Sequence, residues 1–147
     1  MSRSATIKAG DPLPEREYTP DNVQLFLYDA ALWNAHRIHF DHLYTTEVEG
    51  YPGLVVPGPL MGDWLTQCVN EWLGADGTLV SIEFSNRKAA YIGEILRTGG
   101  SVLAIEPDTS TGTSTARLEL FVKNAADEVI APGTAVVDFA AAASGSA

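Results

Sequence analysis

Leu60-Met61-Gly62-Asp63-Trp64-Leu65-Thr66-Gln67-Cys68-Val69-Asn70-Glu71-Trp72-Leu73 is the stretch of this 147-residue chain with the clearest periodicity. Its apolar side chains recur in adjacent pairs one helical turn apart, and its polar side chains occupy the opposite face. The pattern predicts a long amphipathic helix that ends at Gly74 and Gly77. Because its apolar face needs a cover, we expect this helix to lie against a sheet.

Downstream of this helix the apolar period changes to two, as in strands. Two runs carry the alternation: Val80, Ile82 and Phe84, and then Ala116, Leu118, Leu120 and Val122. Gly99-Gly100 is a plausible hairpin turn between strands at 91–97 and 101–106. We expect a loop at 107–112, a turn at 124–127 and a last strand that runs to about Phe139.

Upstream, Pro12 and Pro14 favour an extended segment that would suit an edge strand. Thr19 then resembles a helix N-cap with Pro20 at the first helical position, which predicts a helix over residues 20–32. This helix has one apolar face, formed by Val23, Phe26, Leu27, Ala30 and Ala31. One long helix set apart from a mostly antiparallel sheet is an α+β layout.

Length and composition favour a single domain over residues 1–139, followed by a disordered Ala/Ser/Gly tail over residues 140–147. A formal net charge of −10 argues against non-specific binding to nucleic acid or to an anionic membrane. No apolar run is long enough to span a bilayer, and no secretory leader is recognisable. The lone cysteine, Cys68, cannot form an internal disulfide, which favours a cytoplasmic location.

All three histidines of the chain lie within the run Trp33-Asn34-Ala35-His36-Arg37-Ile38-His39-Phe40-Asp41-His42. Packing alone does not require so many imidazole, amide, guanidinium and carboxylate groups in one place. The run is therefore the candidate functional site.

This run resembles the active-site segment of the MaoC-like hydratases and dehydratases, whose pattern is an Asp, an Asn-Pro step and a His five residues after the Asp. Aligning that His with His39 places Asn34 at the Asp position. The sequence from Trp33 to Asp41 resembles even more closely the motif of one subgroup, the mesaconyl-CoA (methylfumaryl-CoA) hydratases and the 3-hydroxyacyl-thioester dehydratases. The resemblance extends loosely over residues 9–139 and is specific in Trp33–Asp41 and Tyr51–Leu60.

The resemblance implies a hot-dog fold, in which an antiparallel β-sheet wraps around a long central helix. It implies reversible hydration of a 2-enoyl thioester, or dehydration of a 3-hydroxyacyl thioester, carried by coenzyme A or acyl carrier protein. No bound cofactor is implied. It also implies a homodimer, or a heterodimer with a related hot-dog chain, with the substrate tunnel at the subunit interface.

Hydration of an enoyl thioester needs one group that moves a proton to and from water and a second that holds the water. Histidine suits the first task, since its ordinary pKa lies near working pH, and His39 is the candidate. Asn34 can orient water or ligand but cannot act as a base, so the proton transfer falls to His39 unless Asp41 or a residue of a partner subunit shares it. Alternatively, Asn34 and His39 form a hydrogen-bonded pair that holds a loop.

The neighbouring polar residues have several interpretations. His36, His39 and Asp41 could suggest a metal site, but such short spacing occurs by chance and the resembling enzymes use no metal, so none is expected. His36 is either structural or a substrate contact. Arg37 either pairs with an acidic neighbour or meets a carboxylate or phosphate of the ligand. Tyr44 could pack or line the pocket, and His42 is expected at the surface.

Val55-Val56-Pro57-Gly58-Pro59-Leu60 resembles the family's turn into its central helix, where a glycine amide helps to bind the thioester carbonyl. A helix N-terminus presents unpaired N–H groups, so an oxyanion beside Gly58 would be stabilised. Many relatives carry a histidine at the position of Pro57. Because proline has no N–H, the donors must come from Gly58, Leu60 or beyond. A turn that merely starts a helix is the alternative.

Four further predictions concern the ligand and the rival functions. Arg87-Lys88 could meet coenzyme A phosphates or form a solvated strand end, and Trp33 could border the acyl tunnel. A hot-dog thioesterase is one rival, with Asp63 or Glu71 as its carboxylate. A catalytically silent subunit of a heteromeric hydratase is the other, suggested by Asn34 and Pro57.

Overall fold

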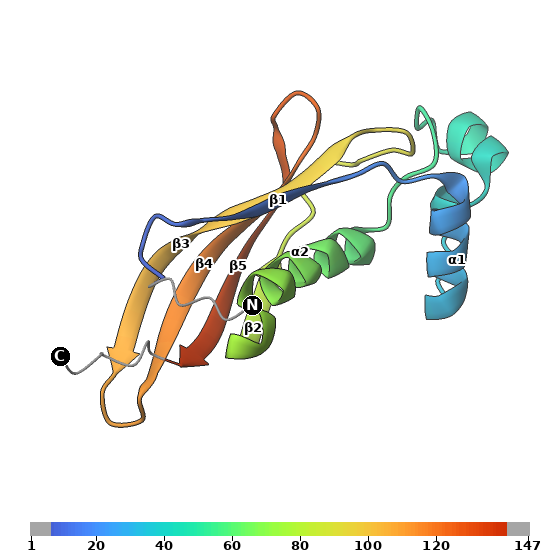
Figure 1. Ribbon diagram of the computed structural model, residues 1–147. Coiled ribbons are helices and arrows are strands. Elements are labelled where there is room, and N and C mark those ends of the chain that lie inside the picture. Colours follow the sequence, from blue (N-terminus) through green and yellow to red (C-terminus); the bar gives the residue numbers. More distant parts are fainter. Residues whose placement is uncertain (1–6, 141–147) are drawn as a thin grey trace.

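The structure, a computed structural model, describes residues 7–140. Five strands form one antiparallel sheet in the order β1-β3-β4-β5-β2 (Figure 1). Their bounds are β1 Pro12–Tyr18, β2 Gly77–Phe84, β3 Leu96–Asp108, β4 Thr113–Lys123 and β5 Val129–Ala140. The predicted α+β layout is confirmed, and β1 is an edge strand as expected.

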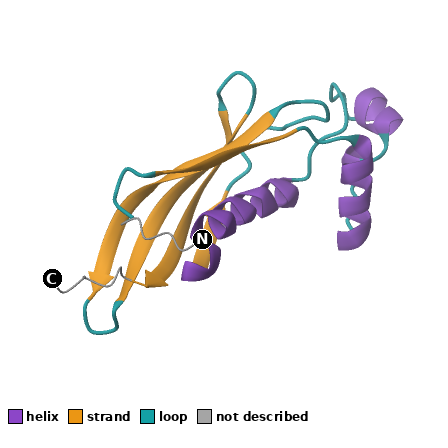
Figure 2. Cartoon of the chain, in the orientation of Figure 1, coloured by secondary structure: helices purple, strands orange, loops and turns teal. Residues whose placement is uncertain are grey.

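The long helix α2, Gly58–Leu73, lies against one face of this sheet and contacts all five strands (Figure 2). Its apolar face forms the centre of the core, where Leu65 and Val69 are fully buried and Trp64 is nearly so. Burial of each such side chain stabilises the fold by about 1.5–3 kcal/mol. The helix ends where Gly74 adopts a φ of 59° and donates its N–H to the Asn70 carbonyl, which confirms the predicted end.

The predicted hairpin turn at Gly99-Gly100 is wrong, because β3 runs straight through both glycines. These glycines allow close approach instead of a turn. A β-carbon on Gly99 would lie 2.6 Å from the ring of Phe121, and one on Gly100 would overlap the backbone carbonyl oxygen of Glu119 on β4. A Gly-Gly pair thus serves tight strand packing here.

Strand β2 forms where alternation predicted it, but its inward side chains differ from the expected ones. A register shift lies between Leu79 and Ser81 in the pairing with β5, and such a bulge shifts the alternation by one residue. Leu79 is therefore partly buried in place of Val80, which is exposed, while Ile82 and Phe84 keep the expected inward face, with the Phe84 ring against Gly62 of α2.

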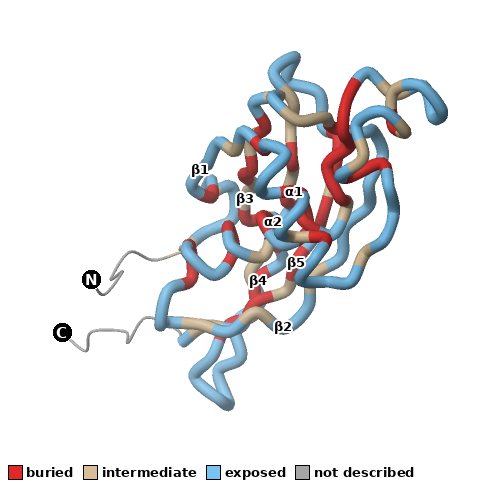
Figure 3. Tube along the Cα trace, turned by 90° about the vertical axis from the view of Figure 1, so that its right-hand side faces the viewer, coloured by how far each residue is buried: buried red, intermediate tan, exposed pale blue. Residues whose placement is uncertain are grey.

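Helix α1 spans Asn22–Leu32 and begins two residues later than predicted. Asp21, not Thr19, is the N-cap, because its carboxylate accepts a hydrogen bond of 2.8 Å from the Gln24 N–H. The apolar face is not covered within the chain: Val23, Phe26 and Leu27 are each 58–60% exposed, and most of α1 is solvent-facing (Figure 3). Only two of its side chains are buried, Leu25 and Asp29.

Three short helical turns complete the structure: η1 Arg37–His39, η2 Tyr44–Val48 and η3 Gly74–Asp76. Ala140 belongs to β5, and the rest of the tail predicted to be disordered lies outside the described residues. Within residues 7–140, no helix is both long and apolar enough to span a bilayer.

Candidate active site

The segment after α1 places His36 and His39 at the start of α2. Trp33 ends α1 in the left-handed conformation, with a φ of 55°, and the Asn34 N–H then donates to the Asp29 carbonyl. The side-chain oxygen of Asn34 accepts a hydrogen bond of 3.0 Å from the His36 N–H. This turn leads directly into η1, which carries His39 inward. Asn34 thus has the loop-holding role, but through His36 instead of His39.

His39 is the buried histidine of the run, with 7% of its surface exposed. Its Nδ1 lies 2.6 Å from the carbonyl oxygen of Val55, on the segment that leads into α2. Because a carbonyl oxygen only accepts, Nδ1 must carry the proton, and in the neutral ring Nε2 then keeps a free lone pair. A neutral imidazole with a free Nε2 is arranged to take a proton.

His39 lines a pocket of about 300 Å³ at the N-terminal end of α2. The other residues lining it are His36, Ile38, Val55, Val56, Gly58, Met61, Asn86, Arg87, Lys88 and Ala89. The structure thus brings together five of the residues singled out from the sequence, namely His36, His39, Gly58 and the basic pair Arg87-Lys88. One pocket therefore contains a proton acceptor, the N-terminus of α2 and two cationic side chains.

Among the described residues, the Gly58 N–H has no hydrogen-bond partner, whereas the Leu60 N–H donates to the Pro57 carbonyl over 3.1 Å. Leu60 itself is buried in the core and is not among the residues that line the pocket. The Leu60 N–H is thus engaged within the chain, and its role as a donor to the thioester oxygen stays a prediction. Since Pro57 and Pro59 have no N–H, Gly58 supplies the free backbone donor at this end of α2.

Asn86 is a pocket residue that the sequence did not reveal. Its side-chain amide packs directly against Gly58, so closely that a β-carbon on Gly58 would overlap it. Nothing in the local sequence marks Asn86, since only the fold brings the segment after β2 to the start of α2. The neighbouring basic pair differs in its contacts. Lys88 forms an ion pair of 2.6 Å with Glu128. Arg87 has no ion-pair partner among the described residues.

Asn34 lines a second hollow, of about 350 Å³, formed by α1 and the segment that follows it. Apolar side chains form most of it: Phe26, Ala30, Trp33, Ala35 and Phe40. Trp33 is 93% exposed, so this hollow is open within the single chain. The structure does not place Asn34 and His39 in one pocket.

Asp29 also lines this second hollow, and the sequence analysis missed it. Only 2% of its surface is exposed, and neither carboxylate oxygen has a hydrogen-bond partner among the described residues. Burial raises the pKa of the Asp29 carboxyl, while positive charge on His39 and on His36 opposes that rise. The available signal was that Asp29 is the one charged residue of α1 and lies one turn after Leu25.

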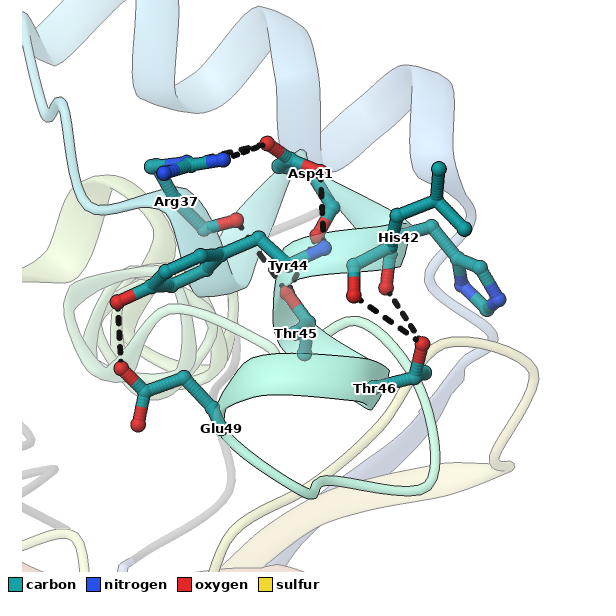
Figure 4. Close-up of polar contacts among 8 residues, drawn as sticks. Arg37, Asp41, His42, Tyr44, Thr45, Thr46 and Glu49 are labelled. Carbon is teal, nitrogen blue, oxygen red and sulfur yellow. Dashed lines mark hydrogen bonds and ion pairs between the residues drawn. The ribbon is translucent and has the colours of Figure 1, made fainter.

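Arg37 lines neither pocket. Its side chain is turned toward Asp41 instead (Figure 4). Its guanidinium binds the Asp41 carboxylate, with Nη2 at 2.8 Å, and lies over the Tyr44 ring at 4.0 Å from the centroid. The Tyr44 N–H and the guanidinium together hold the pKa of the Asp41 carboxyl below its usual range. Of the two roles considered for Arg37, the structure shows the ion pair, and a contact with ligand stays a prediction.

The other aromatic and imidazole side chains of this segment contact neighbours or solvent. The His36 ring meets the His39 ring edge-on, with centroids 5.4 Å apart, and the Tyr44 hydroxyl donates to Glu49. His42 is exposed, as predicted. Within residues 7–140, no three His, Cys, Asp or Glu side chains are grouped as a metal site.

The two carboxylates proposed for a thioesterase are engaged elsewhere. Asp63 accepts a hydrogen bond of 2.8 Å from the Tyr28 hydroxyl, and Glu71 forms an ion pair of 2.7 Å with Arg16. Neither residue lines either pocket. The geometry therefore does not support that rival.

A family model described as hydroxyacyl-thioester dehydratase type 2 matches residues 2–92, more than half of the chain. The chain belongs to this family. It is similar to a mesaconyl-C(4)-CoA hydratase from Chloroflexus aurantiacus, with 54% identity over 46 residues. The match covers 31% of this chain and only 16% of that hydratase. The expected family and subgroup are confirmed.

Comparison with solved structures identifies the fold of this chain. An (R)-hydratase from A. caviae involved in PHA biosynthesis superposes with a TM-score of 0.79 at 15% identity, over 89% of this chain and 96% of that one. A chain of the ChsH1-ChsH2 complex from Mycobacterium tuberculosis superposes with a TM-score of 0.74 at 18% identity, over 90% of this chain and 98% of that one. The predicted hot-dog fold is confirmed.

Proposed function

We propose that this chain reversibly hydrates a 2-enoyl thioester, the reverse reaction being dehydration of a 3-hydroxyacyl thioester. The observation that carries the proposal is the pairing of His39 and Gly58 in one pocket, with a free Nε2 and a free N–H. Membership of the type 2 dehydratase family supports the same reaction.

In the hydration direction, His39 Nε2 takes a proton from water while the water oxygen forms a bond to C3 of the enoyl group. The double bond opens, and negative charge moves to the thioester oxygen. The Gly58 N–H and the positive end of α2 stabilise that oxygen. The imidazolium of His39 then returns its proton to C2, which completes the addition of water.

Asn34 contributes to binding, not to proton transfer. Its carbonyl oxygen is occupied by the His36 N–H, but its amide N–H groups remain available to water or substrate. A place for Trp33 at the border of the acyl tunnel stays a prediction, since its hollow is separate from the His39 pocket. Arg87, which lines the His39 pocket, faces the phosphates of coenzyme A or of an acyl carrier protein.

A second hot-dog chain completes the enzyme, as a homodimer or as a heterodimer with a related chain. The exposed apolar face of α1 supports this arrangement, because contiguous apolar surface of this kind marks association sites. The ChsH1-ChsH2 complex is a heteromeric neighbour of the same fold. A cytoplasmic location and the absence of a cofactor stay predictions.

The test is the loss of the enoyl-thioester absorbance with crotonyl-CoA and with a branched or dicarboxylic enoyl-CoA. His39→Gln, which keeps a side chain able to bond Val55, should lower kcat by about 10²–10⁴-fold, since general base catalysis contributes that much. Asn34→Ala should raise KM more than it lowers kcat. His42→Gln is the matched control, because His42 is exposed and lines neither pocket.

Three outcomes would count against the proposal. Turnover that survives in folded His39→Gln would remove His39 from the chemistry. Turnover that appears only when a related chain is added, and that does not depend on His39, would identify this chain as the silent subunit. Release of free thiol without hydration would indicate a thioesterase.

A further inference from the structure

Asn86 lines the His39 pocket, and the reaction described above uses none of its atoms. Its side-chain amide has no hydrogen-bond partner among residues 7–140. The residue is exposed, yet the amide lies against Gly58, the first residue of α2. Two N–H groups without an acceptor are therefore placed beside the free N–H of Gly58.

The backbone on both sides of Asn86 is anchored to the sheet. The Ser85 N–H donates to the Pro132 carbonyl over 3.1 Å, and the Arg87 N–H donates to the Ile130 carbonyl over 2.9 Å. Both acceptors belong to β5, so the sheet fixes the point from which the Asn86 side chain extends. Gly58 leaves room for the amide because it has no β-carbon.

The separation of the two donors suits one shared acceptor. The Asn86 Cγ lies 2.9 Å from the position that a β-carbon on Gly58 would take, and Nδ2 is closer still. A β-carbon lies about 2.5 Å from its own backbone nitrogen, so Nδ2 is less than about 5.4 Å from the Gly58 nitrogen. Two N–H groups that each bind one oxygen at about 2.9 Å can lie up to about 5.8 Å apart. The two donors can therefore bind the same oxygen.

The backbone at the start of α2 supplies one donor and no second one. Pro57 and Pro59 have no N–H, and the N–H groups of Leu60 and Met61 both donate to the Pro57 carbonyl. An enolate oxygen is stabilised most when more than one preorganised donor binds it. In this structure the second donor must come from a side chain of the pocket.

We propose that the Asn86 amide is this second donor: together with the Gly58 N–H it binds the thioester oxygen and stabilises the negative charge that develops there. The proposal rests on the proposed function. Asn86 transfers no proton and forms no covalent bond, since the proton moves from water to His39 and from His39 to C2.

The first experiment compares kcat and KM for crotonyl-CoA in the full chain, in Asn86→Ala and in Asn86→Asp. Asn86→Ala should lower kcat by about 10²-fold, the lower end for loss of one oxyanion donor, because the residue is exposed and water can replace part of its effect. Asn86→Asp keeps the shape, loses both N–H groups and adds a negative charge, so its kcat should be lower still. Asn70→Ala is the matched control, because Asn70 is exposed on α2 and lines neither pocket.

A space-filling role for Asn86 predicts the opposite order, since aspartate fits the same space and alanine does not. Neither variant should melt below the parent, because the amide bonds to no described residue and a negative charge beside a helix N-terminus is favourable. An unchanged kcat in Asn86→Ala, a change in KM alone, or a higher kcat in Asn86→Asp than in Asn86→Ala would overturn the proposal.

A second measurement separates this proposal from the proposed function. Butyryl-CoA has no double bond to hydrate, so difference infrared spectroscopy with an isotope-labelled carbonyl can follow its bound thioester. Hydrogen bonds to a carbonyl lower its stretching frequency; Asn86→Ala should lose part of the shift seen in the parent, and Asn70→Ala should keep all of it. If the parent shows this pattern but hydrates no thioester, the two-donor site stands and the proposed function fails. A carbonyl band that is the same in the parent and in Asn86→Ala would overturn the two-donor site.

Discussion

One buried hydrogen bond decides what His39 can do chemically. The Val55 carbonyl holds Nδ1 at 2.6 Å and so fixes the proton on that nitrogen. In the neutral ring, Nε2 then keeps the lone pair that can take a proton. Val55 is 16 residues further along the chain, so the local motif around His39 could show a histidine in a catalytic pattern but not its tautomer.

Gly58 and Asn86 form the other decisive contact at this scale. Gly58→Ala would push a β-carbon into the Asn86 amide and destabilise the protein by about 1 kcal/mol, the lower end for overpacking, since the amide can rotate away. In an Asn86→Ala background the same change should cost less, because the overlap is gone. Urea unfolding of the four proteins of this double-mutant cycle measures the difference. Equal costs in both backgrounds would show that Asn86 is not what limits position 58.

At the scale of elements, strand β3 shows that glycines can mark contact as well as turns. Gly100→Ala should destabilise the fold by about 1–3 kcal/mol or more, because the new methyl group meets the backbone of β4, which cannot rotate aside. Gly53→Ala is the matched control, since a β-carbon there meets nothing within 4 Å. Denaturant unfolding checks both. A Gly100 variant as stable as the Gly53 variant would mean that β3 and β4 can separate without cost.

Helix α2 and strand β2 differ in how far the sequence could predict them. The helical pattern of α2 repeats over four turns and covers one wide face, so its boundaries and buried side chains follow from periodicity. In β2 a single bulge between Leu79 and Ser81 reverses the alternation halfway. Such a bulge depends on the pairing with β5, which no pattern within β2 reports.

At the scale of the molecule, α1 and the turns after it project beyond the end of the sheet (Figure 1). If a second chain covers α1, the double variant Val23→Glu, Leu27→Glu should be monomeric while its circular dichroism stays that of the parent, because both residues are more than half exposed. Sedimentation or light scattering of the purified chain measures this. Gln24→Glu, an added charge at an exposed position of the same helix, is the control.

A monomeric parent at micromolar concentration would contradict the homodimer. Co-purification with a related hot-dog chain would then test the heterodimer, with the same double variant as the probe. Retained association in the charged variant would place the interface elsewhere on the chain.

The sequence by itself determined the α+β class, the long central helix, the family and the choice of His39, because these depend on periodicity and on one short run of polar residues. Only the tertiary structure decided that Asn86 meets Gly58, that Leu60 has no free N–H and that Asp29 is buried and unpartnered. The physical reason is that a pattern reports which side chains are apolar or charged along one element. What covers each of them, and which groups are left without a partner, depends on segments distant in the chain.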